Sequence, residues 1–284
     1  MAWHASLTVD YSLRAAQTVA HFRHSGPLRI LQSLYPEGPG ICHNVIVHPP
    51  GGLVGGDQLE LQFATATGAH SVVTTPGATR FYRAAETSPD NRGTNTARQQ
   101  VHLKLASQSR MEWLPLEAIA YSGCQAENSL TMEIADGAEL IGWDVTALGL
   151  PAANQSFVSG FFSQHIAWPG IWLEQAHIAS SDTLLLESPL GLAGQRCLAT
   201  LFFASGNPLS RLRRQMALDS ARACIEPHPL ATWAGATSPE GRLVVVRVLA
   251  PQVEPAMNLL RLIADAWRMA LWQLPACRPR IWNV

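Results

Sequence analysis

The stretch LTMEIADGAELIGW, residues 130–143, places two runs of alternating apolar and polar residues on either side of the turn sequence ADGA. Alternation with period two is typical of strands that bury one face. The same pattern recurs toward the N-terminus in five further runs: LRILQSLY (28–35), NVIVH (44–48), LELQFATA (59–66), HSVVTT (70–75) and QVHLKLA (100–106). The sequence therefore predicts a mainly β fold.

The connections between these runs are short and rich in turn residues. Turn sequences stand about a dozen residues or more apart: PEGPG (36–40), ATGA (66–69), SGC (122–124) and ADGA (135–138). Such spacing favours antiparallel pairing, because it leaves little room for crossover helices. The polar segment ETSPDNRGTNTAR, residues 86–98, is predicted to be a mobile loop.

Helical spacing appears only in the C-terminal half of the chain. One helix is predicted near 207–225, with Asn207 as its cap and Pro208 at its first position. A second is predicted near 254–274, where apolar residues occupy most of the helical circumference. We expect Trp267 and Leu271 in this helix to face a protein partner or to support the surface that does. Without a clear linker, residues 1–284 are predicted to form a single domain.

Composition excludes several classes of function. The chain has 284 residues, a net charge of −1 and only 14% charged residues, so nothing attracts it to nucleic acid or to an anionic membrane. No window is apolar enough to span a bilayer, and the N-terminus does not resemble a secretory signal. The five cysteines are scattered, which favours free thiols in a reducing compartment: Cys42, Cys124, Cys197, Cys224 and Cys277. We therefore expect a cytoplasmic protein.

The glycine-rich stretch HPPGGLVGGD, residues 48–57, suggests a close approach of backbone to phosphate, metal, ligand or another strand. A phosphate-binding loop requires a lysine, whereas Lys104 is the only lysine in the chain. The motifs G-x-S-x-G and H-E-x-x-H are also missing from the sequence. The chain is not predicted to be an enzyme, although an active site assembled from distant residues remains an alternative.

Four carboxylates stand beside apolar or glycine-rich sequence: Asp57, Glu60, Glu117 and Asp144. A buried carboxylate must be paired, hydrogen-bonded or near a cation. Each of the four could cap a turn or pair strands. Together they could also line a path for a hydrated divalent cation, since a few oxygen ligands bind nickel weakly and release it readily.

Five motifs carry a resemblance to a known family: HPPGGLVGGD (48–57), TTPGATRFYR (74–83), EWLPLEAI (112–119), GWDVTALGLPA (142–152) and RPRIW (278–282). In this order, they resemble the UreD (UreH) family of urease accessory proteins over almost the whole chain. The resemblance implies a layered, helix-like stack of strands with a small helical part. It also implies that the glycines of 48–57 let strands approach closely beside a narrow passage.

The same resemblance implies a non-catalytic nickel-insertion chaperone. Such a protein binds UreF directly and the GTPase UreG through UreF, and the complex docks on apo-urease. No tightly bound cofactor is expected, and nickel would pass through the protein in transit. The chain departs from the family pattern at Leu116, Ala118, Leu150 and Gln155, where relatives carry other, often polar, residues. A structural β-scaffold without a metal role remains the other alternative.

Overall fold

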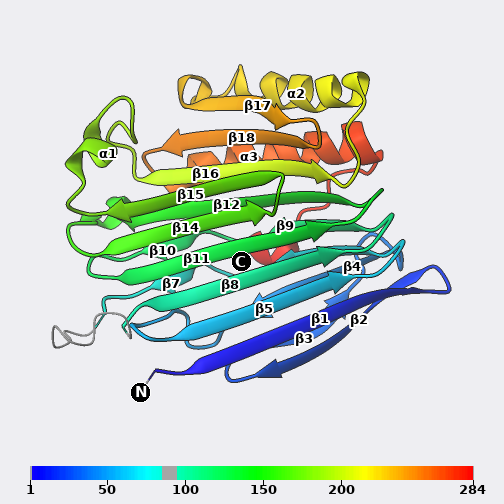
Figure 1. Cartoon of the computed structure of the whole chain (residues 1–284), viewed down its shortest axis with the longest axis horizontal. Helices are drawn as coiled ribbons and strands as arrows, with labels where there is room; N and C mark the ends of the chain where they lie inside the picture. Colours follow the sequence, from blue (N-terminus) through cyan, green and yellow to red (C-terminus); the bar gives the residue numbers. More distant parts are fainter. Residues whose placement is uncertain (1, 85–94, 284) are drawn as a thin grey trace.

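The computed structural model describes residues 2–84 and 95–283, whose strands form two facing sheets (Figure 1). The seven-stranded sheet runs in spatial order through β15 (Trp172–Ala179), β14 (Phe161–Trp168), β11 (Gln125–Ile134), β8 (Ala97–Leu105), β5 (Gln58–Thr65), β1 (His4–Arg14) and β2 (Gln17–Ser25). The predicted mainly β fold is confirmed.

The second sheet has eleven strands among the described residues. Its main path is β17 (Ala234–Glu240), β18 (Leu243–Ala250), β16 (Cys197–Ser205), β12 (Glu139–Leu150), β9 (Arg110–Leu114), β6 (His70–Thr74), β4 (Ile41–Val47) and β3 (Arg29–Leu34). Three short strands join it off this path: β7 (Thr79–Phe81), β10 (Ala118–Ala120) and β13 (Gln155–Ser156).

The central strands of both sheets pair in parallel, so the predicted antiparallel pairing is wrong there. The chain alternates between the sheets, placing β4, β6, β9 and β12 side by side in one and β5, β8, β11 and β14 in the other. Each strand returns through the opposite sheet, so parallel neighbours need no helix between them. This is the helix-like stack of strands that the family resemblance implies.

Similar four-residue turns link the two sheets on successive rungs, at 66–69, 106–109 and 135–138. In each, the fourth residue donates its backbone N–H to the carbonyl of the first, at 3.0 to 3.1 Å. The third residue has positive φ in each turn: Gly68 (73°), Gln108 (60°) and Gly137 (75°). These turns therefore carry the chain from one sheet to the other rather than back along the same sheet.

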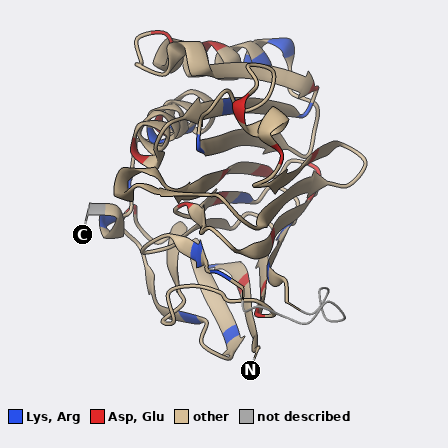
Figure 2. Cartoon of the chain, turned by 90° about the vertical axis from the view of Figure 1, so that its left-hand side faces the viewer, with Lys and Arg blue, Asp and Glu red and all other residues tan. Residues whose placement is uncertain are grey.

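Helices cover the outer face of the eleven-stranded sheet at one end of the stack (Figure 1). They are α2 (Arg211–Ile225), α3 (Val253–Trp267) and the π-helical turn η4 (Arg268–Trp272), while the short α1 (Thr183–Glu187) lies elsewhere. The 3₁₀ turns in the described part of the chain are η2 (Pro151–Ala153), η3 (Ala231–Trp233) and η5 (Arg280–Asn283). Basic and acidic residues are interspersed over the molecule (Figure 2), as the small net charge implies.

The first long helix begins later than predicted. Ser210 is its N-cap, and its Oγ accepts the backbone N–H of Arg213 at 3.2 Å. The Asn207 side chain instead accepts a hydrogen bond from the backbone N–H of Gly137, so it secures a sheet-to-sheet turn. Asn207 is therefore not the cap, because this tertiary contact competes with local capping.

The glycine-rich segment 48–57 packs against another strand. Leu53 donates its backbone N–H to the carbonyl of Arg80 at 2.7 Å, and Tyr82 donates to the carbonyl of Leu53 at 2.8 Å. A Cβ on Gly52 would lie 2.6 Å from the Arg80 carbonyl oxygen, so glycine is required there. The predicted loop at 86–98 lies mostly outside the described residues, and β8 begins at Ala97.

Candidate functional site

A band of polar side chains crosses the otherwise apolar space between the two sheets. On the seven-stranded sheet, Gln99, Asn128 and Gln164 are in register on three adjacent strands. Facing them, Asp144, Thr200 and Arg247 are in register on three adjacent strands of the other sheet. We call these six residues, with Glu174 of β15, the polar seam.

Asp144 is the centre of the seam and is only 8% exposed. Its Oδ2 accepts a hydrogen bond from the Asn128 amide at 3.0 Å, and its Oδ1 accepts one from the Gln164 amide at 2.5 Å. The Gln99 amide donates in turn to Asn128 Oδ1 at 3.1 Å. A carboxylate buried between the sheets is thus held by amides from the opposite sheet.

The seam continues through Glu174 toward the surface. Thr200 Oγ1 donates to Glu174 Oε1 at 2.6 Å, and Arg247 donates to Glu174 Oε2 from Nε at 2.9 Å and from Nη2 at 2.5 Å. The Arg247 side chain is 52% exposed. The seam therefore connects a buried carboxylate with solvent.

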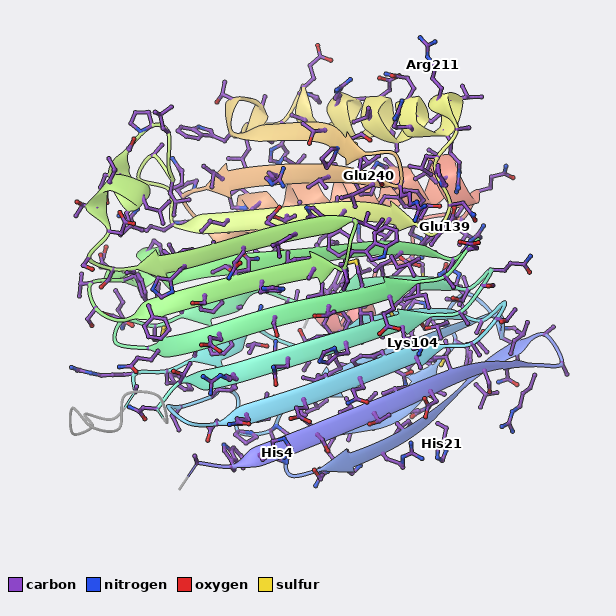
Figure 3. The ribbon with its side chains drawn as sticks, in the orientation of Figure 1. His4, His21, Lys104, Glu139, Arg211 and Glu240 are labelled. Carbon is purple, nitrogen blue, oxygen red and sulfur yellow. The ribbon has the colours of Figure 1, made fainter. Side chains whose placement is uncertain are left out.

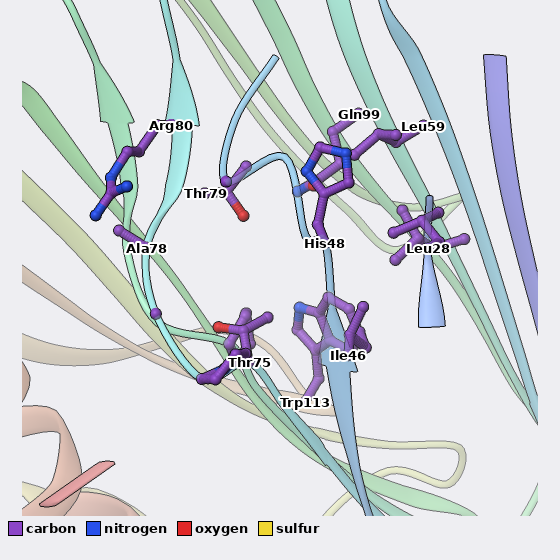
Figure 4. A pocket seen from close by; sticks show the side chains of 15 residues that line it. Leu28, Ile46, His48, Leu59, Thr75, Ala78, Thr79, Arg80, Gln99 and Trp113 are labelled. Carbon is purple, nitrogen blue, oxygen red and sulfur yellow. The ribbon is translucent and has the colours of Figure 1, made fainter. Parts of the chain in front are cut away.

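At the other end, a cavity of about 180 Å³ opens beside the glycine-rich segment (Figure 4). Its lining includes His48, Thr79, Gln99 and Trp113. A smaller pocket of about 20 Å³, room for roughly one water molecule, shares Thr79, Gln99 and Trp113 with it and reaches Asp144. Gln99 thus joins the cavity to the seam.

The structure places two of the predicted carboxylates in this arrangement, Asp57 beside the cavity and Asp144 at the centre of the seam. Asp57 is 1% exposed, and its carboxylate accepts the backbone N–H groups of Val54 at 2.9 Å and Trp3 at 3.2 Å. Burial lowers the pKa of the cavity-lining His48, and the nearby Asp57 charge opposes that shift. Asp57 therefore secures a turn beside the cavity, while Asp144 lies beyond it.

The other two predicted carboxylates lie away from the seam. Glu60 alternates with core residues of β5, so it points outward, where it pairs with His4 at 3.1 Å. Figure 3 labels His4 at the start of β1. Glu117 lies near Cys197, whose side chain is on the opposite, helix-covered face of the eleven-stranded sheet. Burial of the Cys197 thiol, and then the Glu117 charge, raises the pKa of that thiol to about 12. Its charge also acts on Arg261 of α3.

The two predicted partner-facing residues are buried within this chain. Trp267 is 0% exposed and donates its Nε1–H to the Ala217 carbonyl of α2 at 2.8 Å. Leu271 is 8% exposed and belongs to the same helix-side core. These buried positions fit the expectation that Trp267 and Leu271 support a partner-facing surface, rather than the expectation that they contact the partner directly.

Comparison with known proteins identifies the family of the chain. The model of the family described as UreD urease accessory protein matches residues 4–283. The chain belongs to the UreD family.

Relatives named "Urease accessory protein UreD" match over their full length. The protein of Polaromonas naphthalenivorans (strain CJ2) is 65% identical over 284 residues, covering 100% of both chains. That of Variovorax paradoxus (strain S110) is 59% identical over 282 residues and 99% of both chains. That of Methylibium petroleiphilum (strain ATCC BAA-1232 / LMG 22953 / PM1) is 46% identical over 303 residues, covering 100% of each.

Two departures from the expected UreD pattern lie beside the seam. Leu116 and Ala118 line the small pocket that reaches Asp144, and they present apolar surface there. Leu150 ends β12, and Gln155 pairs with it from β13.

Within residues 2–84 and 95–283, no helix is both long and apolar enough to cross a membrane.

Asp144 gives the stability of this UreD-family chain a specific pH dependence. Burial first, and then the Glu174 charge, raises the pKa of Asp144 from 3.8 to about 6. A raised folded-state pKa means that the folded chain holds this proton more tightly than the unfolded chain, so stability is lost as the pH rises from 3.8 through about 6.

We expect the wild type to lose about 2 to 3 kcal/mol relative to Asp144→Asn between about pH 4 and about pH 7. Denaturant unfolding of both proteins at each pH measures this difference, in which the other titratable groups largely cancel. A difference that does not change with pH would contradict the ionisation of a buried Asp144.

Proposed function

We propose that the chain is a non-catalytic chaperone of urease maturation. In this role it binds a UreF-type protein directly, associates through it with a UreG-type GTPase, and assists GTP-dependent nickel insertion into apo-urease. Membership in the UreD family supports the role in urease maturation. GTP hydrolysis would belong to the GTPase, and the part of this chain in nickel insertion would require no tightly bound cofactor.

The polar seam is the observation that carries the nickel part of the proposal. A hydrated cation needs oxygen ligands that bind it weakly, and it would find them in the carboxylates of Asp144 and Glu174 and the amide oxygens around them. The cavity beside His48 and the small pocket at Gln99 supply space leading toward Asp144.

The arrangement also suits release of the ion. The Asp144 carboxylate has donors on both oxygens, from Asn128 and Gln164, so an arriving cation competes with existing hydrogen bonds. A route has to release its ion as readily as it accepts it, and such competition keeps binding weak. We therefore propose Asp144 and Glu174 as waypoints, with Asp57 positioning the entrance beside His48.

The experiment is Asp144→Asn in cells that co-express apo-urease and its accessory proteins. The change removes the charge and keeps the shape, so the accessory complex should still co-purify while urease activity and the nickel content of urease fall severalfold. Adding Asp57→Asn should lower both further. Glu133→Gln is the matched control, because Glu133 is 69% exposed on the outer side of β11 and its loss should leave activation unchanged.

The two alternatives predict different results. If the Asp144→Asn complex assembles and loads nickel at the wild-type rate, Asp144 is structural and the chain is a scaffold without a metal route. If the purified chain alone catalyses a reaction that does not depend on the accessory proteins, the enzyme alternative is correct.

A further inference from the structure

A second polar network lies on the helix-covered face of the eleven-stranded sheet, away from the seam. Arg268 of η4 is 3% exposed and pairs with both Glu37 and Glu112. His43 Nε2 lies 2.8 Å from Glu37 Oε1, and His70 Nε2 lies 3.1 Å from Glu112 Oε1. The network joins the central strands of the sheet to the helical layer.

The C-terminal tail brings a thiol to this network. Three potential ligand atoms lie within 4.8 Å of one another: a carboxylate oxygen of Glu37, a ring nitrogen of His43 and the sulfur of Cys277. We propose that these three side chains form a binding site for a divalent transition-metal ion of borderline softness, such as Zn²⁺ or Ni²⁺.

The donor set defines the class of ion. Imidazole and thiolate favour zinc, nickel, cobalt and copper, whereas calcium and magnesium prefer oxygen alone. Around a tetrahedral ion with bonds of about 2.0 to 2.3 Å, ligand atoms are about 3.3 to 3.8 Å apart. The three atoms therefore need to approach one another by about 1.5 Å at most, within the reach of side-chain rotation.

The surrounding charges also favour a cation. Glu37 and Glu112 carry two negative charges against one positive charge on Arg268, and a Cys277 thiolate would add a third negative charge. A divalent ion bound by the three side chains would balance this excess of negative charge. Arg268 binds Glu37 through Oε2, whereas His43 contacts Oε1, so Oε1 faces the imidazole that would share the ion.

The ion would fasten the tail to the sheet. Cys277 follows η4, while Glu37 lies in the turn before β4 and His43 within β4. Farther along the tail, Trp282 Nε1 already donates to Thr74 Oγ1 at 2.9 Å, so the tail is held beside these strands. Three protein ligands leave a coordination position for water or for a group from another molecule. The site does not depend on the proposed nickel route, which lies on the other face of the sheet.

The test uses Co²⁺ as the probe with the full chain, freed of metal by a chelator and kept reduced. We expect the near-ultraviolet charge-transfer absorption of a cobalt–thiolate bond, its loss in Cys277→Ser, and its retention in Cys224→Ser. Cys224 is the matched control because it is also partly exposed and lies on α2, outside the network. His43→Gln should weaken Co²⁺ binding about tenfold or more. Replacing a residue that only contacts a metal ligand already costs about tenfold in affinity, and His43 would be a ligand itself.

Alkylation of the wild-type thiols gives a second measurement that does not require a variant to fold. Zn²⁺ or Ni²⁺ should slow the alkylation of Cys277, located by mass spectrometry, and leave that of Cys224 unchanged. A folded wild type without the cobalt–thiolate band, a band that survives in Cys277→Ser, or equal alkylation of Cys277 with and without metal would each overturn the proposal.

Discussion

Replacing Arg268 with methionine is expected to lower the free energy of unfolding by about 3 to 5 kcal/mol, the usual cost of removing one partner of a buried ion pair. The guanidinium is shared by Glu37 and Glu112, whose side chains are 9% and 2% exposed. Methionine preserves much of the packing volume but leaves both carboxylates buried without their cation. Denaturant unfolding of the two proteins at neutral pH measures the loss.

The same comparison at low pH checks the cause. Burial acts to raise the pKa of Glu112, but the hydrogen bond and charge of His70 and the charge of Arg268 outweigh it, and the pKa lies below 4.5. A lowered folded-state pKa gives stability that is present above 4.5 and lost as the pH falls through the folded value. The cost of Arg268→Met should therefore shrink in acid.

Arg278→Met is the matched control for this effect. Arg278 lies ten residues farther along the chain, is 46% exposed and pairs with Asp265 at 2.7 Å. Exposed ion pairs contribute about 0 to 1 kcal/mol, so this variant should be nearly as stable as the wild type. Equal effects of the two substitutions would contradict a special role for burial at Arg268.

The fold class could be predicted because it depends on local pattern. Alternation in runs such as 130–143 identified the strands, and apolar spacing located both long helices. The direction of pairing could not be predicted, since a turn such as 135–138 looks the same whether it returns along one sheet or crosses to the other. The false cap at Asn207 has a similar origin, because its partner Gly137 is 70 residues away in sequence.

The candidate site was only partly predictable for the same reason. Asp144 was identified from its apolar neighbours, but Glu174 and Arg247 are distant in sequence, and only the packing of two sheets brings them together. A usable signal did exist in β11, where Asn128 interrupts the inward-facing series Ala126, Leu130 and Met132. A polar residue at an inward position of an alternating run indicates a buried polar partner.

The double substitution Trp267→Asp with Leu271→Asp is expected to abolish folding of the chain. Trp267 packs edge-on against Phe203, with ring centroids 6.3 Å apart, and also forms its buried hydrogen bond to α2. Truncating a buried tryptophan alone costs about 3 to 5 kcal/mol, and burying two carboxylates adds further desolvation cost. The sum is comparable with the roughly 5 to 15 kcal/mol that stabilises a typical domain.

A matched double variant on exposed positions of the same segment separates folding from partner binding. Leu262 and Met269 are seven residues apart and are 45% and 55% exposed, so Leu262→Asp with Met269→Asp should fold normally. Circular dichroism and soluble yield measure folding, and co-purification with a UreF-type protein measures binding. Loss of binding by the folded exposed variant would identify this helical segment as part of the partner surface. A Trp267→Asp/Leu271→Asp protein that folds like the wild type yet fails to bind would show instead that the two buried side chains become accessible to the partner, contrary to the packing seen here.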